Sequence, residues 1–138
     1  MVEVPLASHT QFMQIYNRVV VDLLTDERAD RVFHALSDAT RRDIIVRALE
    51  GEHSVSALAR RYPVSFAAVQ KHVAVLESAG LVTKHKNGRE QLVRSNVDTI
   101  RRAERLLEQL EAVWEARINR MDEILSDDAR PPTKGRKR

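Results

Sequence analysis

The sequence predicts a mainly α-helical fold with one β-hairpin, and three observations support that prediction. Apolar residues recur at spacings of three and four along most of the chain, which is the period of an amphipathic helix. The 138 residues include only four glycines and four prolines, too few for a turn-rich all-β protein. One Asn-Gly pair, at residues 87 and 88, lies between two short runs of β-compatible residues, which is a strong hairpin signal.

Composition limits the classes of function. Hydrophobic residues make up 43% of the chain, enough for the core of about one domain. No run of about 18 apolar residues predicts a membrane span, and no basic and apolar leader predicts secretion, so we expect a cytoplasmic protein. The chain contains no cysteine, which excludes disulfides, thiolate metal sites, cysteine nucleophiles and thiol redox sensing.

Three helices are expected in the first third of the chain, after an unstructured start over residues 1–9. Residues 10–24 carry apolar side chains at helical spacing. Thr25 or Asp26 would cap a second helix that runs to about residue 36. Asp38 would cap a third helix, which Gly51 ends.

Two further helices are joined by a short turn. Ser54 would cap a short helix over residues 55–62, which cannot continue because Pro63 disfavours helical geometry in the residue before it. Ser65 would cap the next helix and Gly80 would end it, and its core-facing residues would be Val69, Val73 and Leu76. Two helices connected in this way form a helix-turn-helix, whose second helix reads DNA.

The outward face of this second helix is the candidate recognition surface. It mixes small residues with an amide, a cation and an imidazole, and such a face can enter a DNA groove and contact bases. Phe66 either packs on a thymine methyl group or closes the core of the motif. The alternative interpretation is an ordinary amphipathic surface helix. The predicted DNA contacts on this helix are Ser65, Phe66, Ala67, Ala68, Gln70, Lys71 and His72.

The predicted hairpin directly follows this helix, as the wing does in a winged helix-turn-helix. Lys84, Lys86 and Arg89 suit contacts with phosphate, and Arg89 also suits the minor groove. Residues 38–94 hold ten Lys and Arg against six Asp and Glu, whereas residues 97–126 hold five against seven. The basic part of the chain is therefore the part that would bind DNA. A solvated hairpin with no binding role is the alternative.

A long helix is expected over residues 97–126, because the helical period returns there. Its apolar stripe is too long to be buried on a small winged domain, so we expect a partner helix, most simply its own copy in a second subunit. The N-terminal helix can join this seam, and a helix folded back on its own domain is the alternative. The predicted dimer contacts are Phe12, Ile15, Val19, Leu107, Leu110, Trp114, Ile118, Met121 and Leu125.

These elements divide the chain into four parts. Residues 1–27 form a tail and a dimerisation helix, residues 28–96 the winged helix-turn-helix core, and residues 97–126 a second dimerisation helix. Residues 127–138 hold two prolines, a glycine and five cations, a composition that predicts a disordered basic tail.

Three stretches within residues 32–93 resemble the ArsR family of bacterial winged helix-turn-helix repressors. They are Phe-His-Ala-Leu-Ser-Asp-Ala-Thr-Arg-Arg at 33–42, Ser-Val-Ser-Ala-Leu-Ala at 54–59, and Ala-Val-Gln-Lys-His-Val-Ala-Val-Leu-Glu-Ser-Ala-Gly-Leu-Val at 68–82. The resemblance implies a homodimer, held by the first and last helices, that binds double-stranded DNA at an inverted-repeat operator. Its two recognition helices would lie about 34–36 Å apart, one turn of DNA.

The usual metal switches of that family have no counterpart here. One family site is a Cys-x-Cys pair in the first helix of the motif, and residues 53–59 contain no cysteine. Another uses His and Asp on the last helix, and residues 97–126 contain no histidine. The five histidines include no pair at a spacing of three or four. We therefore expect no metal and no cofactor, and the sequence does not define a small-molecule effector.

The leading hypothesis is a dimeric, nucleoid-associated repressor that competes with polymerase for its promoter. Arg41 and Arg42 are further candidates for phosphate contact, although Arg41 can instead pair internally with an acidic residue. One alternative is a repressor that releases DNA when a metal or small ligand binds a non-cysteine site. Another is a winged-helix module that binds proteins without binding DNA. No catalytic residue is expected, because no phosphate loop, Ser-His-Asp set or carboxylate pair is evident.

Overall fold

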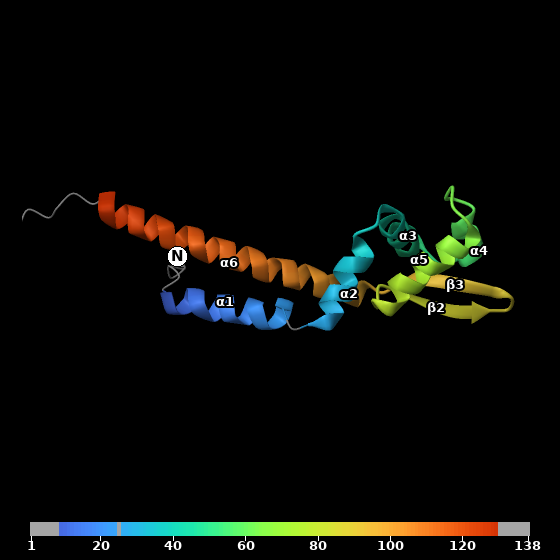
Figure 1. Ribbon diagram of the computed structural model, residues 1–138, viewed down its shortest axis with the longest axis horizontal. Coiled ribbons are helices and arrows are strands. Elements are labelled where there is room, and N and C mark those ends of the chain that lie inside the picture. Colours follow the sequence, from blue (N-terminus) through green and yellow to red (C-terminus); the bar gives the residue numbers. More distant parts are fainter. Residues whose placement is uncertain (1–8, 25, 130–138) are drawn as a thin grey trace, which may run out of the picture. The chain divides into compact units, whose positions relative to one another are not determined.

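The computed structural model describes residues 9–24 and 26–129, and it confirms the mainly α-helical fold with a β-hairpin wing (Figure 1). The described part forms two compact units. One comprises residues 26–105, and the other combines the first helix with the chain from residue 106 onward. Within the described ranges, no helix is long and apolar enough to cross a membrane. The helices are α1 (His9–Leu24), α2 (Glu27–Leu36), α3 (Ala39–Glu50), α4 (Val55–Ala59), α5 (Phe66–Ser78) and α6 (Val97–Ala129), and the strands are β1 (His53–Ser54), β2 (Val82–Asn87) and β3 (Glu90–Ser95).

Side-chain caps fix the starts of four helices in the unit of residues 26–105. Asp26, Asp38, Ser54 and Ser65 each have extended backbone geometry, and each accepts a hydrogen bond from a backbone N–H in the first turn of α2, α3, α4 and α5 respectively. The four distances are 2.9, 3.0, 3.0 and 3.1 Å. Each cap satisfies a donor that the helix itself leaves unpaired, so these residues set where the helices begin.

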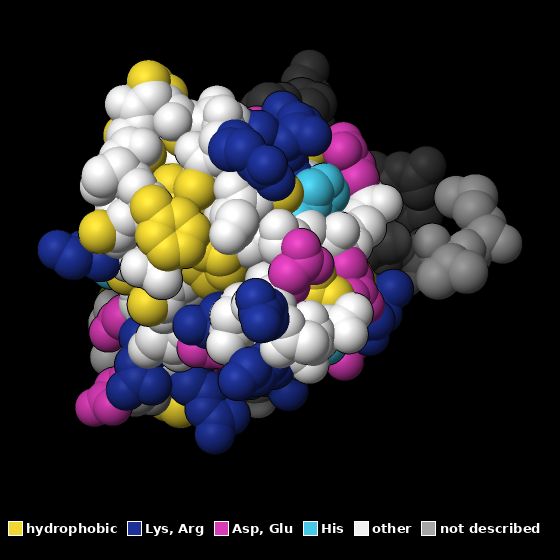
Figure 2. Space-filling model, turned by 90° about the vertical axis from the view of Figure 1, so that its right-hand side faces the viewer, with side chains coloured by type: hydrophobic (Ala, Val, Ile, Leu, Met, Phe, Trp, Pro, Cys, Tyr) yellow, Lys and Arg dark blue, Asp and Glu magenta, His cyan; other side chains and the backbone are white. Residues whose placement is uncertain are grey.

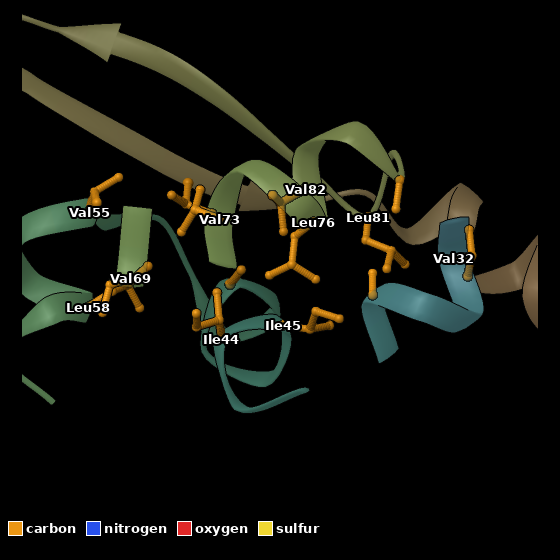
Figure 3. Close-up of a cluster of buried hydrophobic side chains, with 14 of the residues drawn as sticks. Val32, Ile44, Ile45, Val55, Leu58, Val69, Val73, Leu76, Leu81 and Val82 are labelled. Atoms are coloured by element: carbon orange, nitrogen blue, oxygen red, sulfur yellow. The ribbon is translucent and has the colours of Figure 1, made fainter. Parts of the chain in front are cut away.

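The core of this unit lies between α3, α4, α5 and the sheet (Figure 3). The predicted stripe of α5 is fully buried, and Figure 3 shows Val73 and Leu76 above Ile44 and Ile45 of α3. Burying this stripe on one side leaves the opposite side of α5 free, which is what positions the candidate recognition surface. The largest fully buried side chains are Ile44, Leu58, Val69, Val73, Leu76, Leu81, Val82 and Val93.

The sheet has three antiparallel strands in the order β1-β3-β2. The strand β1 is an addition to the predicted fold, since its two residues are too short to carry an alternating pattern. In the hairpin, Asn87 pairs with Glu90, so the turn residues are Gly88 and Arg89 rather than the predicted Asn-Gly pair. Of these two turn residues, Gly88 has a positive φ, +63°, and Arg89 does not, which fits a two-residue loop that needs glycine at its first central position.

The first helix of the helix-turn-helix is shorter than predicted. It ends at Ala59 instead of residue 62, and residues 60–65 connect it to α5 through turns and bends. The chain turns more tightly after this helix than an α-helix does, because Arg61 N donates to Leu58 O, only three residues earlier, at 3.0 Å. The helix therefore ends before Tyr62, the residue in which Pro63 disfavours helical geometry.

Gly80 ends α5 as predicted, with a φ of +77°. Its N–H donates to Glu77 O at 2.9 Å and the Leu81 N–H donates to Leu76 O at 3.0 Å, the two bonds of a Schellman cap. The hydroxyl of Thr99, near the start of α6, donates to Gly80 O at 2.7 Å. The end of α5 is thereby joined to the first turn of α6.

The second unit pairs α1 with the later part of α6 (Figure 1). Among the described residues of this unit, Leu106, Ala116 and the predicted dimer contact Val19 are buried within the chain, whereas the predicted dimer contact Leu107 is exposed. Most of the predicted stripe is exposed in the single chain, with Trp114 at 59%. The helix α6 runs further than predicted, because residues 127–129 of the predicted tail belong to it. The other residues of the predicted tail, 130–138, and residues 1–8 of the predicted unstructured start lie outside the described residues.

Candidate nucleic-acid interface

A groove of about 370 Å³ lies between the first turns of α5 and the hairpin. Four of the side chains predicted to contact DNA converge on it, namely Phe66 and Gln70 from α5, Lys84 from β2 and Arg89 from the turn. The end of the molecule that carries α4 and the hairpin is shown in Figure 2, where Lys and Arg side chains form separate groups and hydrophobic side chains are exposed. The remaining lining residues are Val55, Ser56, Val73, Glu90 and Gln91.

Phe66 lies on the open side of α5. Its side chain is 47% exposed, which rules out the alternative that it closes the core of the motif. Val64, two residues earlier, is also an exposed large hydrophobic residue. An apolar ring at the rim of a polar groove can contact a thymine methyl group, whereas Gln70 one turn later offers both a donor and an acceptor.

Strand alternation places Lys84 and Gln91 of the wing on the face that carries the groove. Val82 pairs with Ser95 and Lys84 with Val93 in the β2–β3 ladder, so the buried valines and Lys84 share the face that packs against α5. Gln91 lies two residues before Val93 and therefore on the same face. Sequence reasoning missed Gln91 because this assignment requires the register, while Ser56 carried no signal beyond its place next to a cap.

The wing cations differ in their electrostatic surroundings. Lys84 Nζ lies 3.6 Å from Glu77 Oε1 of α5, so its charge is partly balanced. Lys86 and Arg89 are exposed, and neither has an ion-pair partner among the residues that the structure describes. These two cations are therefore available to an external anion.

Arg41 and Arg42 are committed to the C-terminal end of α2. Arg41 donates from Nε to Ala35 O at 2.7 Å and from Nη2 to His34 O at 3.1 Å, and Arg42 donates from Nη1 to Leu36 O at 2.7 Å. Internal pairing of Arg41 was one predicted alternative, but its partners are carbonyl oxygens rather than an acidic residue. Carbonyls at a helix end lack partners within the helix, so cations there are stabilising.

His72 links the recognition helix to this cluster. Its Nδ1 lies 3.2 Å from Nη1 of Arg41, and its side chain is half-buried. Because guanidinium groups only donate, Nδ1 is the acceptor in this contact. His72 therefore holds a packing position, while Lys71 beside it is exposed and lies outside the lining of the groove.

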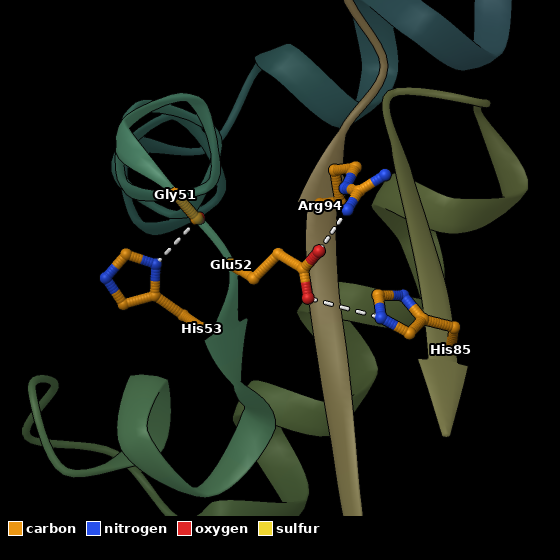
Figure 4. Close-up of polar contacts among 5 residues, drawn as sticks. All are labelled: Gly51, Glu52, His53, His85 and Arg94. Carbon is orange, nitrogen blue, oxygen red and sulfur yellow. Dashed lines mark hydrogen bonds and ion pairs between the residues drawn. The ribbon is translucent and has the colours of Figure 1, made fainter. Parts of the chain in front are cut away.

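The base of the wing is held by Glu52 (Figure 4). Its carboxylate accepts a hydrogen bond from Arg94 of β3 and lies 3.2 Å from His85 Nε2 of β2. The Arg94 guanidinium, with His85 nearby, holds the pKa of Glu52 below its ordinary value. His85 and Arg94 lie on the face of the hairpin away from α5, so this contact ties both strands to the loop before β1.

The turn of the helix-turn-helix is fixed by a second polar contact. The hydroxyl of Tyr62 donates to Asp43 Oδ2 at 2.6 Å, and Arg47 Nε lies 3.3 Å from the same oxygen. The hydrogen bond from Tyr62 lowers the pKa of Asp43. Burial, reinforced by the Asp43 charge, raises the pKa of Tyr62 to about 12. This contact holds the turn of the helix-turn-helix against α3.

Metal ligands do not gather in the described ranges. No group of three or more His, Cys, Asp or Glu side chains there is arranged to hold an ion.

Comparisons with known proteins give a consistent result. A family model described as a helix-turn-helix domain matches residues 36–85. The HTH-type transcriptional regulator Rv2034 of Mycobacterium tuberculosis is 46% identical over 59 residues, which are 43% of this chain and 55% of that protein, so the match spans about half of that relative.

Solved structures match over more of the chain. An ArsR-like transcriptional regulator from Rhodococcus sp. RHA1 is 36% identical, with a TM-score of 0.68, and the match covers 72% of this chain and 92% of that one. The homodimeric winged helix-turn-helix DNA-binding domain of Mb0332 from Mycobacterium bovis is 22% identical, with a TM-score of 0.50, over 74% of this chain and 81% of that one. The second likeness is one of fold alone.

Proposed function

The chain belongs to the ArsR family of transcriptional regulators, and from that membership we propose that it is a homodimeric repressor that binds an inverted-repeat operator. One observation carries this proposal: the groove between α5 and the wing, where an exposed aromatic ring, an amide and two cations converge. A surface of this kind offers base-edge contacts from the helix and phosphate contacts from the wing.

Base contacts are assigned to the start of α5. Gln70 pairs with adenine through its amide, and Phe66 packs on a thymine methyl group beside it. Ala67 and Ala68 are small enough to let the helix backbone approach the base edges. Lys71, exposed on the same helix outside the groove lining, supplies a further donor to the DNA. Ser65 caps the helix through its hydroxyl, which accepts from Ala68 N at 3.1 Å, so its contribution is the position of the helix.

Phosphate contacts are assigned to Lys86 and Arg89, with Lys84 joining when its pair with Glu77 opens. Each phosphate that a cation neutralises releases counterions, so affinity for any DNA falls as salt rises. Arg41 and Arg42 already donate to the carbonyls at the end of α2, and we leave these two arginines out of the proposed binding surface.

Dimerisation is assigned to the exposed apolar face of the second unit. Fully burying an apolar side chain of this size contributes roughly 1.5–3 kcal/mol, so a second copy that covers this face gains several such contributions. The homodimeric state of Mb0332, a protein of the same fold, supports this arrangement. The exposed residues of the face include Leu107, Leu110, Trp114, Met121 and Leu125.

Light scattering and DNA binding on the same samples test this function. The full chain should have twice the mass of one copy, and Trp114→Glu should shift it to one copy and weaken operator binding, because a single half-site then remains. Asp127→Glu, an exposed change at the end of α6, is the matched control. A wild-type chain that is monomeric at micromolar concentration and binds the operator equally well would contradict the dimer.

The same assay separates the alternatives. A chain that shows no DNA affinity even at low salt would be a protein-binding module. Release of bound DNA on metal titration would indicate a metal-responsive repressor, which we do not propose. We propose no catalytic activity, and we place the working protein at the chromosome in the cytoplasm.

A further inference from the structure

A second hollow, of about 250 Å³, lies at the C-terminal end of α5 within the unit of residues 26–105. Three arginines line it, Arg28 and Arg31 from α2 and Arg102 from α6. The end of α5 and Thr99 complete its walls, through Glu77, Ser78, Ala79 and Gly80.

The arginines of this hollow are not neutralised from within the fold. None of the three forms an ion pair in the part of the chain that the structure describes. The single carboxylate of the lining, Glu77, is engaged instead by Lys84 at 3.6 Å. Three arginines that line one small volume bring like charges to the same hollow, and an anion bound there would offset them.

We propose that this hollow is a binding site for a small multivalent anion that carries phosphate or carboxylate groups. Guanidinium groups bind such oxygens through paired, charge-assisted hydrogen bonds, and three of them suit an anion with more than one charge. The hydroxyls of Ser78 and Thr99 line the same space. Its volume, below the roughly 300–1,000 Å³ typical of pockets for drug-sized ligands, limits the occupant to a small molecule.

The location separates this hollow from the DNA-binding groove. The groove lies at the N-terminal half of α5 and the hollow at the opposite end, and the helix has 13 residues. From Gln70 in the groove to Ser78 in the hollow is eight residues, so at 1.5 Å per residue the two sites are roughly 12 Å apart along the helix axis. We therefore assign the arginines to a soluble anion rather than to the DNA backbone.

One ion pair connects the hollow with the proposed DNA-binding surface: Glu77 lines the hollow, while its partner Lys84 lines the groove. The regulatory part of the inference rests on the proposed function: the anion is an effector that acts on α5 from its far end. The binding part stands on the hollow alone.

Calorimetric titration of the full-length protein without DNA tests the site. Inorganic pyrophosphate and citrate are titrated separately at constant ionic strength, so the tighter ligand identifies phosphate or carboxylate chemistry. We expect saturable binding at one site per chain, weakened about tenfold or more by Arg31→Gln and by Arg102→Gln. The control is Arg101→Gln, which removes an exposed arginine that lies outside the hollow and 3.8 Å from Asp98.

Three results would overturn the proposal. The first is that neither anion binds, and the second is that sodium chloride of the same ionic strength gives the same response. The third is that Arg31→Gln and Arg102→Gln, with the wild-type helical circular dichroism spectrum, bind the anion as tightly as the wild type. Loss of DNA affinity in Arg102→Gln without any anion binding would assign the arginines to the DNA backbone and would also overturn it. Since the titration contains no DNA, its failure leaves the proposed DNA-binding function standing.

Discussion

Lys84 Nζ lies 3.6 Å from Glu77 Oε1, so one ion pair joins the wing to the C-terminal end of the recognition helix. The contact places a carboxylate beside a cation that we assign to phosphate. Both side chains are partly exposed, 29% for Lys84 and 44% for Glu77. An exposed pair of this kind is weak, about 0–1 kcal/mol, and DNA phosphate can therefore compete for the lysine.

Glu77→Gln should tighten DNA binding. The substitution frees Lys84 and removes a negative charge near the duplex, and we expect affinity for all DNA to rise by about two- to fivefold at low salt. Fluorescence anisotropy with a random duplex measures the change. Glu50→Gln, an exposed glutamate on α3 without an ion pair in the described chain, is the control. Unchanged or weaker binding by Glu77→Gln would mean that Lys84 makes no phosphate contact.

Lys86→Ala should weaken binding to every DNA sequence alike. Lys86 is exposed on β2 and pairs with Gln91 in the ladder, so its removal leaves the hairpin register unaffected. The logarithmic dependence of affinity on salt should flatten by at most about one unit of slope. A loss confined to the operator, with random DNA bound as before, would show that this lysine reads sequence instead.

Gln70→Ala should reduce the preference for operator over random DNA more than it reduces affinity for DNA in general. The amide is exposed on α5 and lines the groove, and a bidentate contact with adenine contributes about 1–3 kcal/mol of discrimination. Competition of labelled operator against random duplex in a gel-shift assay measures the ratio. If the ratio stays at its wild-type value, the assignment of base contact to Gln70 is wrong.

Tyr62→Phe should lower stability by about 1 kcal/mol near neutral pH, because it removes the 2.6 Å hydrogen bond to Asp43. The pKa of Asp43 is lowered in the fold, so its stabilising effect is present above the ordinary carboxyl pKa and is lost as pH falls through the folded value. The pKa of Tyr62 is raised to about 12 from 10.0, so the wild type also loses stability as pH rises between those values.

Urea denaturation of both proteins at acidic, neutral and alkaline pH measures this effect. The difference in unfolding free energy should be largest near neutral pH and should shrink at both extremes. A difference near zero at every pH would show that the Tyr62–Asp43 contact does not contribute to stability, and a constant nonzero difference would contradict its dependence on the ionisation of the two groups.

Local chemistry made much of this fold predictable. Asp38, Ser54 and Ser65 begin helices because a short polar side chain can pair a backbone N–H of the next turn, a contact within three residues. Gly80 ends α5 because the Schellman cap requires a positive φ. The stripe of α5 followed from the helical period. These features depend on neighbours in sequence, so the sequence alone suffices to place them.

The features that were missed or shifted depend on distant parts of the chain. The strand β1 exists because β3 lies beside it, and two residues carry no pattern of their own. The partners of Arg41 are carbonyl oxygens of the preceding helix, which become accessible only once α2 and α3 are packed. The turn residues follow from the hairpin register, which the packing of Val82 and Val93 in the core determines.

Selection from a random-sequence duplex library, followed by sequencing of the bound fraction, tests whether the protein recognises an inverted repeat as a dimer. We expect one enriched motif made of two inverted half-sites whose centres lie about 10–10.5 base pairs apart, since a dimer presents α5 to two successive major grooves. Enrichment should weaken with Gln70→Ala and persist with Lys86→Ala at low salt. A bound fraction without an enriched motif, or with a single half-site, would contradict a dimeric protein that recognises an inverted repeat.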